Sequence, residues 1–187
     1  LESLHKFSKD MYKDYWSDRK SVLEKDSPYA NKTYVVLANN NHTRINTLVE
    51  KLQAQDIEVY IADKSFQAKD ASNHLGKTQP ATIPKGSLII PNRQPEARLL
   101  SAIMEFDAQR LPETVQQERQ KLLREGQSIM YDTSAWNLTM MYGLEALTLP
   151  INVTDNISPY LANNAAKIKA STDSIAWAVN GDDDASV

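Results

Sequence analysis

The strongest constraint on the fold is a strand-like run, an amphipathic helix and a second strand-like run, which follow one another between residues 33 and 62. The first run, residues 33–38, is apolar and β-branched, which is typical of a strand covered on both faces. Residues 43–55 place Ile45, Leu48, Val49 and Leu52 at helical spacing, with polar residues opposite. Residues 57–62 form the second run. Because a right-handed crossover between parallel strands is the default geometry for such a unit, a mainly parallel sheet is predicted.

A helix is expected before this unit and an irregular segment after it. Residues 1–26 carry apolar groups at helical spacing on a charged background, at Leu4, Phe7, Met11, Tyr15 and then Val22 or Leu23. The residues around Pro28 end this helix, because proline disfavours a helical conformation at the residue before it. Residues 63–82 are polar and contain Gly76 and Pro80, so we expect an irregular loop there.

The second half of the chain continues with alternating strand and helix signals. Pro84-Lys85-Gly86 predicts a turn, and residues 87–91 predict a buried strand. Pro95 suits the first turn of a helix that turns Ala97, Leu99, Leu100, Ile103 and Met104 inward. A polar helix is expected at 112–125, ended by Gly126. A short helix should follow, capped by Thr133 or Ser134 and ended by Gly143. Strands are expected at 147–149 and 175–179.

Composition excludes several classes of partner. A length of 187 residues, with 41% hydrophobic and 24% charged residues, is typical of one globular domain. The net charge of -3 gives no reason to expect nucleic acid as a partner. No apolar run approaches the roughly 18 residues that a membrane span requires. We therefore expect neither nucleic acid binding nor a membrane span.

The side chains needed for common hydrolytic sites are missing or badly spaced. The chain has no cysteine, so thiol nucleophiles and cysteine-bound zinc are excluded. Its three histidines, His5, His42 and His74, are followed three residues later by residues other than glutamate, so no His-x-x-Glu motif exists. We therefore expect no catalytic residue, no metal ligand and no cofactor in this chain. A hydrolase built on Ser87 or Ser134, with His42 or His74 as the base, is the weakest alternative.

Two short segments supply the candidate binding residues. In a crevice beside strand ends, Asn92, Arg93 and Gln94 would place polar groups where α/β sheets hold ligands, and Asp132 and Trp136 could line the same crevice. Arg93 and Arg98 are the cations that could pair with a carboxylate. The competing interpretation, which we favour, is that Asn92 and Gln94 cap the helix after Pro95, Asp132 bonds nearby amides and Trp136 is core.

The same segments carry a resemblance to a known family. Gly86, Ser87, Pro91, Gln94 and Pro95 match a Gly-Ser-strand-Pro-x-x-Gln-Pro segment. Tyr131, Asp132, Ser134, Ala135 and Trp136 match a Tyr-Asp-x-(Ser/Thr)-Ala-Trp segment. In this order the two segments resemble the class I glutamine amidotransferase-like domain that follows the peptidase domain in many bacterial zinc carboxypeptidases of the carboxypeptidase A-like class. The resemblance covers residues 33–187, but the cysteine nucleophile of the amidotransferases is absent.

The resemblance sets the functional expectation. It implies a three-layer α/β fold with a mainly parallel, flavodoxin-like sheet at residues 33–187. From the residues themselves we expect a helical arm and linker at 1–32 before this domain. We also expect the domain to be truncated at its C-terminal end, because almost nothing follows the strand predicted at 175–179. It implies a non-catalytic accessory domain that supports the peptidase domain of the same polypeptide or presents peptide substrate, in a periplasmic or secreted protein. Zinc would belong to that peptidase domain. The alternative is a domain that itself binds a small molecule or a peptide carboxylate.

Overall fold

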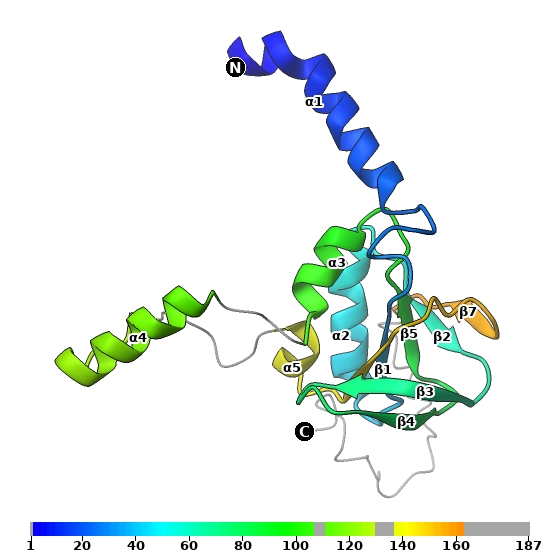
Figure 1. The fold of residues 1–187 in the computed structure, drawn as a ribbon. Helices are drawn as coiled ribbons and strands as arrows, with labels where there is room; N and C mark the ends of the chain where they lie inside the picture. The colour runs from blue at the N-terminus through cyan, green and yellow to red at the C-terminus, as the bar shows by residue number, and fades with distance from the viewer. Residues whose placement is uncertain (1, 107–110, 130–136, 163–187) are drawn as a thin grey trace, which may run out of the picture.

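The computed structural model describes residues 2–106, 111–129 and 137–162, with side chains from residue 6 onward. These residues form a curled sheet with helices packed on one of its faces, and two further helices that project from this body (Figure 1). The helices are α1 (Glu2–Ser21), α2 (His42–Gln53), α3 (Ala97–Met104), α4 (Pro112–Glu125) and α5 (Leu138–Met141). The strands are β1 (Thr33–Val36), β2 (Tyr60–Ala62), β3 (Phe66–Asn73), β4 (Thr78–Ile83), β5 (Leu88–Pro91), β6 (Ala146–Leu149) and β7 (Ile157–Pro159).

The sheet has the strand order β4-β3-β6-β1-β5-β2-β7, and every neighbouring pair is antiparallel. β1 lies at its centre, paired with β5 on one side and β6 on the other. Each edge strand contains a proline, Pro80 in β4 and Pro159 in β7. Proline has no backbone N–H to donate and therefore weakens an edge as a template for further strands.

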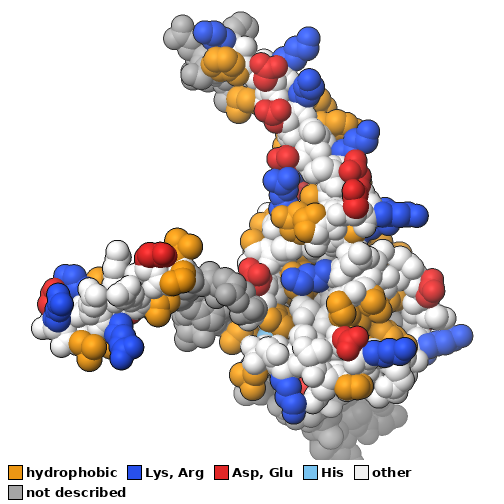
Figure 2. Space-filling model, in the orientation of Figure 1, with side chains coloured by type: hydrophobic (Ala, Val, Ile, Leu, Met, Phe, Trp, Pro, Cys, Tyr) orange, Lys and Arg blue, Asp and Glu red, His pale blue; other side chains and the backbone are white. Residues whose placement is uncertain are grey.

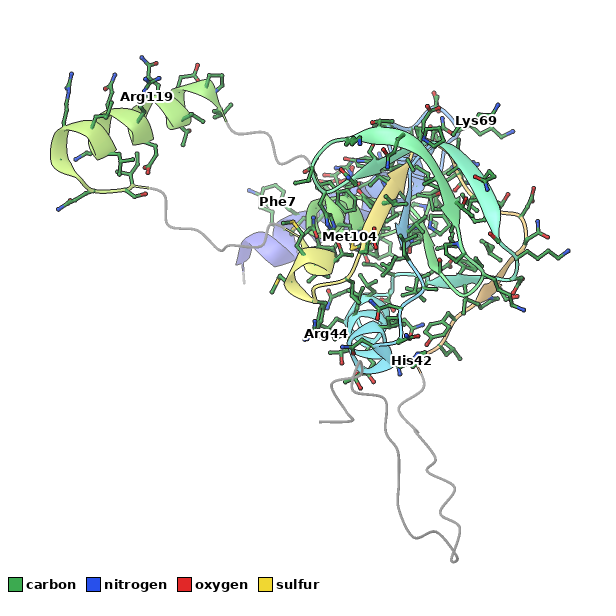
Figure 3. All side chains as sticks on the ribbon, turned by 90° about the horizontal axis from the view of Figure 1, so that it is seen from below. Phe7, His42, Arg44, Lys69, Met104 and Arg119 are labelled. Atoms are coloured by element: carbon green, nitrogen blue, oxygen red, sulfur yellow. The ribbon has the colours of Figure 1, made fainter. Side chains whose placement is uncertain are left out.

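One face of the sheet is covered by α2 and α3. Figure 1 shows the two helices side by side over the central strands. Alternate residues of the strands, such as Tyr34, Val36 and Ile90, pack against Leu48 and Leu100 from the helices. Figure 3 labels Met104, which closes α3 and is fully buried in the same cluster. This alternation follows from the two-residue period of a strand, which sends neighbouring side chains to opposite faces.

The other face of the sheet is covered by the sheet itself. Val35, Ile89 and Leu147 on the central strands pack against Ala68 and Ile83, which come from the β3–β4 hairpin. The seven strands therefore curl into a half-barrel with a second apolar cluster inside it. Lys69, at the outer side of the hairpin, points away from this cluster (Figure 3).

The prediction of a mainly parallel, three-layer, flavodoxin-like sheet is wrong. β1 and β2 do run in the same direction, because both are antiparallel to β5, but β5 lies between them and no two neighbours are parallel. The apolar run at β1 correctly indicated burial on both faces, since all four of its residues are buried. Burial on both faces does not fix strand direction, because here a curled hairpin covers the face that a second helix layer would cover in a parallel sheet.

The prediction of an irregular loop at residues 63–82 is also wrong, because β3 and β4 form a long hairpin there. Two features hide the strands in the sequence. The inward residues of β3 are the small Ala68 and Ala71, which carry little hydrophobic signal. In addition, the register shifts between them, so that two polar residues intervene and the period of two is broken.

Most of the other described elements confirm the predictions. α2 buries Ile45, Leu48, Val49 and Leu52, as the spacing indicated. The strands predicted at 87–91 and 147–149 are β5 and β6, and the turn before β5 has Gly86 at φ 89°. α4 ends at Gly126, which adopts a left-handed conformation. The short helix α5 begins at Leu138 and is capped by Asn137, so the prediction of Thr133 or Ser134 as its cap is wrong. Thr133, Ser134 and the strand predicted at 175–179 lie outside the described residues.

Two helices stand away from the body. α1 and α4 project from it in different directions, and Figure 3 shows Phe7 on α1 and Arg119 well out on α4. No residue of α4 is buried. α1 has the length for a bilayer but charged residues recur along it, and none of the described helices is both long and apolar enough to cross one.

Candidate functional site

Asn92 and Gln94, the two predicted site residues with amide side chains, are fixed inside the protein. Asn92 follows β5, is fully buried and donates from Nδ2 to Ser101 Oγ at 2.9 Å. Gln94 accepts the Glu58 N–H at Oε1 (2.7 Å) and donates from Nε2 to Pro91 O (2.7 Å). These contacts connect β5 to the segment before β2 and to α3, so both amides have a structural role. The prediction that they cap α3 is wrong, because Glu96 is the N-cap residue and no side chain caps this helix.

The two predicted cations contact the N-terminal arm. Arg93 Nε donates to the carbonyl of Leu23 at 2.7 Å. Arg98 Nη2 lies 3.2 Å from Asp18 Oδ1, in a pair whose side chains are both more than half exposed. Arg98 therefore already has a carboxylate partner, although an exposed pair of this kind is worth little, about 0–1 kcal/mol.

Asp132 and Trp136, the remaining predicted site residues, lie outside the described residues, and so does Ser134. The structure thus brings Asn92, Arg93, Gln94 and Arg98 together at the end of β5 and the start of α3. Only Arg93 and Gln94 border a hollow at this point.

This hollow, which we call the Arg93 hollow, has a volume of about 300 Å³. Its polar residues are Glu58, Tyr60, Arg93, Gln94, Asn152 and Thr154, and Pro91, Val153 and Ile157 form its apolar wall. Glu58 and Asn152 were not predicted as site residues, because Glu58 lies in an apolar run and Asn152 in a segment without periodicity. Both residues reach the hollow through antiparallel strand pairs, which were not expected in a parallel sheet.

Two residues of the Arg93 hollow have distinctive chemistry. The Tyr60 hydroxyl donates to Glu58 Oε2 at 2.6 Å. This hydrogen bond, together with burial and the charge of Glu58, raises the pKa of Tyr60 above its usual value of 10.0. Asn152, unlike Tyr60, lacks a hydrogen bond at its side-chain oxygen. Its Oδ1 is shielded from solvent and has no hydrogen-bond partner among the described residues.

Ser87, the one candidate nucleophile of the hydrolase alternative that the structure describes, is not accessible to a substrate. Ser87 is fully buried, and its Oγ accepts the Ala38 N–H at 3.1 Å, so a substrate carbonyl cannot reach it. His42 lies with Arg44 in the first turn of α2 (Figure 3), whereas His74 lies after β3. Within the ranges that the structure describes, no group of three or more histidine, aspartate and glutamate side chains could hold a metal ion.

His74 belongs to a structural chain of hydrogen bonds. Its Nε2 lies 2.9 Å from Thr139 Oγ1, and Thr139 donates its own proton to Asn137 Oδ1 at 2.8 Å. The imidazole must therefore be the donor to Thr139. Asn137 in turn caps α5 by accepting the Met140 N–H and donates to Glu105 O. The chain links the β3–β4 turn to the ends of α5 and α3.

This arrangement predicts a loss of stability in mild acid. Burial lowers the pKa of His74 below 6.5, and the charge of Glu145 opposes this in part. As the pH falls through 6.5, the unfolded chain takes up a proton that the folded chain resists, so the free energy of unfolding decreases. Urea unfolding between pH 7.5 and 5.5 should show this decrease, and His74→Gln should remove it. An equal slope in the two proteins would contradict the assignment to His74.

Comparison with protein-family models, with curated proteins and with solved structures found no match to this chain.

Proposed function

We propose that this chain is a non-catalytic accessory region of a zinc carboxypeptidase, in which α1 contacts the peptidase domain of the same polypeptide. The motif pair at Gly86–Pro95 and Tyr131–Trp136 suggests the family. The antiparallel sheet is unlike the sheet of an amidotransferase, so it does not support this family. The family is supported by the two motifs, and the contact by the surface of α1.

The observation that supports the proposal best is the uncovered apolar face of α1. Phe7, Met11 and Tyr15 repeat every four residues, and Tyr12 and Trp16 widen the stripe. Met11 is 54%, Tyr12 72% and Trp16 63% exposed, although aromatic residues normally provide much of the buried area in cores and interfaces. Figure 2 shows hydrophobic side chains along α1, with basic and acidic side chains beside them. A stripe of this kind on a projecting helix is typical of a protein contact site.

The body of the protein holds the C-terminal end of α1 by several contacts. Arg19 meets Glu96 at 2.7 Å, and its guanidinium also stacks on the Tyr15 ring at 3.6 Å. Val22, just after α1, is almost fully buried. The Arg98–Asp18 pair adds a second contact across the same junction. These contacts hold the C-terminal end of α1 against the body.

The peptidase domain is the occupant that fits this surface best. In the proteins that the two motifs resemble, this type of domain follows the peptidase domain, so α1 is the described element nearest to it along the chain. An aromatic stripe bordered by charges of both signs suits the surface of a folded domain better than an anionic membrane or nucleic acid. In this arrangement the accessory region supports the peptidase domain or helps to present peptide substrate to it, and zinc and the catalytic residues belong to that domain.

Polar substitutions on the α1 stripe should reduce binding to the peptidase domain without changing the stability of the chain. We expect the double change Tyr12→Ser and Trp16→Ser to leave the unfolding midpoint of the chain unchanged, since both side chains are exposed. The same change should weaken binding to the separately expressed peptidase region by at least roughly tenfold, because interface aromatics are common hot spots. Calorimetric titration measures this affinity.

The matched control for this experiment lies on α4. Leu123 is 75% exposed on the other projecting helix, and Leu123→Ser should leave the affinity unchanged. Equal binding by the parent chain and the α1 variant would refute the contact. A surrounding coding sequence without a His-x-x-Glu peptidase region would refute the family.

The non-catalytic part of the proposal has its own test. The isolated chain, supplied with zinc, should not release C-terminal residues from carboxypeptidase substrates above the rate of a blank. Robust turnover that persists after repurification would overturn this part of the proposal.

A further inference from the structure

The Arg93 hollow contains two opposite charges that do not pair with each other. Arg93 uses Nε for the Leu23 carbonyl, and the other two guanidinium nitrogens have no partner among the described residues. Glu58 accepts the Tyr60 hydroxyl at one oxygen, and no ion pair involves it within the described ranges. A cationic donor and an anionic acceptor thus border one small space and are both available to a ligand.

Asn152 borders the same hollow as part of its wall. Its Oδ1 is shielded from solvent and has no partner, which is unusual because buried polar atoms are normally hydrogen-bonded. The residue is also held in place, because Thr33 Oγ1 donates to the carbonyl of Ile151 at 2.7 Å and accepts the Val153 N–H at 3.1 Å. Because its shielded Oδ1 is out of reach of a molecule in the hollow, Asn152 is a fixed residue of the wall. Glu58 is therefore the acceptor for a ligand that brings N–H donors.

The size and wall of the hollow limit the ligand further. A volume of about 300 Å³ lies at the lower end for small-molecule sites, so a nucleotide or a long peptide would not be enclosed. Pro91, Val153 and Ile157 offer a small apolar surface between the polar groups. The requirements are therefore a carboxylate, an ammonium group and a small aliphatic side chain.

We propose that the Arg93 hollow binds a small aliphatic α-amino acid, with its carboxylate at Arg93 and its ammonium group at Glu58. The guanidinium can bind a carboxylate through its two terminal nitrogens, which is the strongest geometry for this pairing. The Tyr60 hydroxyl holds Glu58 in position for the ammonium group. This inference is independent of the proposed contact of α1, because no residue of the hollow belongs to that helix.

Three related probes test the two charges of the ligand. L-valine should bind saturably at millimolar concentration in NMR titrations of the full chain, with shifts at the amides of residues 58, 93 and 152. N-acetyl-L-valine lacks the ammonium group and L-valinamide lacks the carboxylate, so each should bind at least roughly tenfold more weakly. A flat titration with L-valine overturns the inference. Equal binding of all three probes overturns the zwitterion assignment.

Matched variants test the residues. Arg93→Gln should weaken L-valine binding at least roughly tenfold and leave the weak binding of L-valinamide unchanged, because only the carboxylate contact is removed. Glu58→Gln should also weaken L-valine binding but leave the weak binding of N-acetyl-L-valine unchanged, because only the ammonium contact is removed. Arg98→Gln is the control, since it removes an equal charge and a contact to the arm but lies outside the hollow. A loss in Arg98→Gln as large as in Arg93→Gln would overturn the role of Arg93, and amide spectra confirm that each variant is folded.

Discussion

Replacing Thr33 by valine is expected to destabilise the protein by about 2–4 kcal/mol, although the two side chains have nearly the same shape. Thr33 is fully buried at the start of β1. Its hydroxyl donates to the carbonyl of Ile151 at 2.7 Å and accepts the Val153 N–H at 3.1 Å. Valine can do neither, so a part-buried backbone acceptor and a buried backbone donor lose their partner, and each such loss costs up to about 1–3 kcal/mol.

The consequence of Thr33→Val should extend to the Arg93 hollow. The segment from Ile151 to Val153 carries Asn152, and the Thr33 hydroxyl bonds its backbone on both sides of that residue. The variant should therefore also bind L-valine more weakly, even though Thr33 itself does not border the hollow.

Urea unfolding at pH 7.5 measures the stability effect against a matched control. Thr82 is an exposed threonine on β4 that bonds only the side chain of Gln67. Thr82→Val should change the free energy of unfolding by no more than about 0.5 kcal/mol. If Thr33→Val and Thr82→Val unfold at the same urea concentration, the Thr33 hydroxyl does not anchor the segment.

The predictions were correct where a structure depends on residues within a single helix or turn. The stripe of Ile45, Leu48, Val49 and Leu52 is an internal property of a helix, and α2 buries all four residues. The positive φ of Gly86 and the left-handed stop at Gly126 were likewise predicted from single residues and their neighbours. These features need no knowledge of what the element packs against.

Pairing between distant segments could not be predicted in the same way. Val35 would show the same burial whether a helix or a curled hairpin covered it, so β1 carried no information on strand direction. Ala68 and Ala71 are small, and the bulge between them conceals the alternation of β3. The Arg93 hollow shows the same limit, because Glu58, Arg93 and Asn152 meet only through antiparallel pairs formed over long separations.

Replacing Gln94 by methionine is expected to cost about 2–4 kcal/mol, since methionine keeps the volume but removes every hydrogen bond of the amide. Gln94 is almost fully buried, and it accepts the Glu58 N–H at 2.7 Å while donating to Pro91 O at 2.7 Å. Gln67→Met is the matched control, because Gln67 is exposed on β3 and bonds only Thr82. Urea unfolding should show a large loss for Gln94→Met and a change within about 0.5 kcal/mol for Gln67→Met.

The variant Gln94→Glu separates the donor from the acceptor of the amide. The carboxyl group can still accept the Glu58 N–H, but in its ionised form it brings a second oxygen toward Pro91 O and Glu58 O, where Nε2 donates in the parent chain. Repulsion and burial should therefore raise the pKa of this carboxyl group in the folded state. A raised pKa gives stability that is present in acid and lost as the pH rises. The difference in unfolding free energy between Gln94→Glu and the parent should thus be small at pH 4 and large at pH 7, and a difference independent of pH would show that the donor half of Gln94 is dispensable.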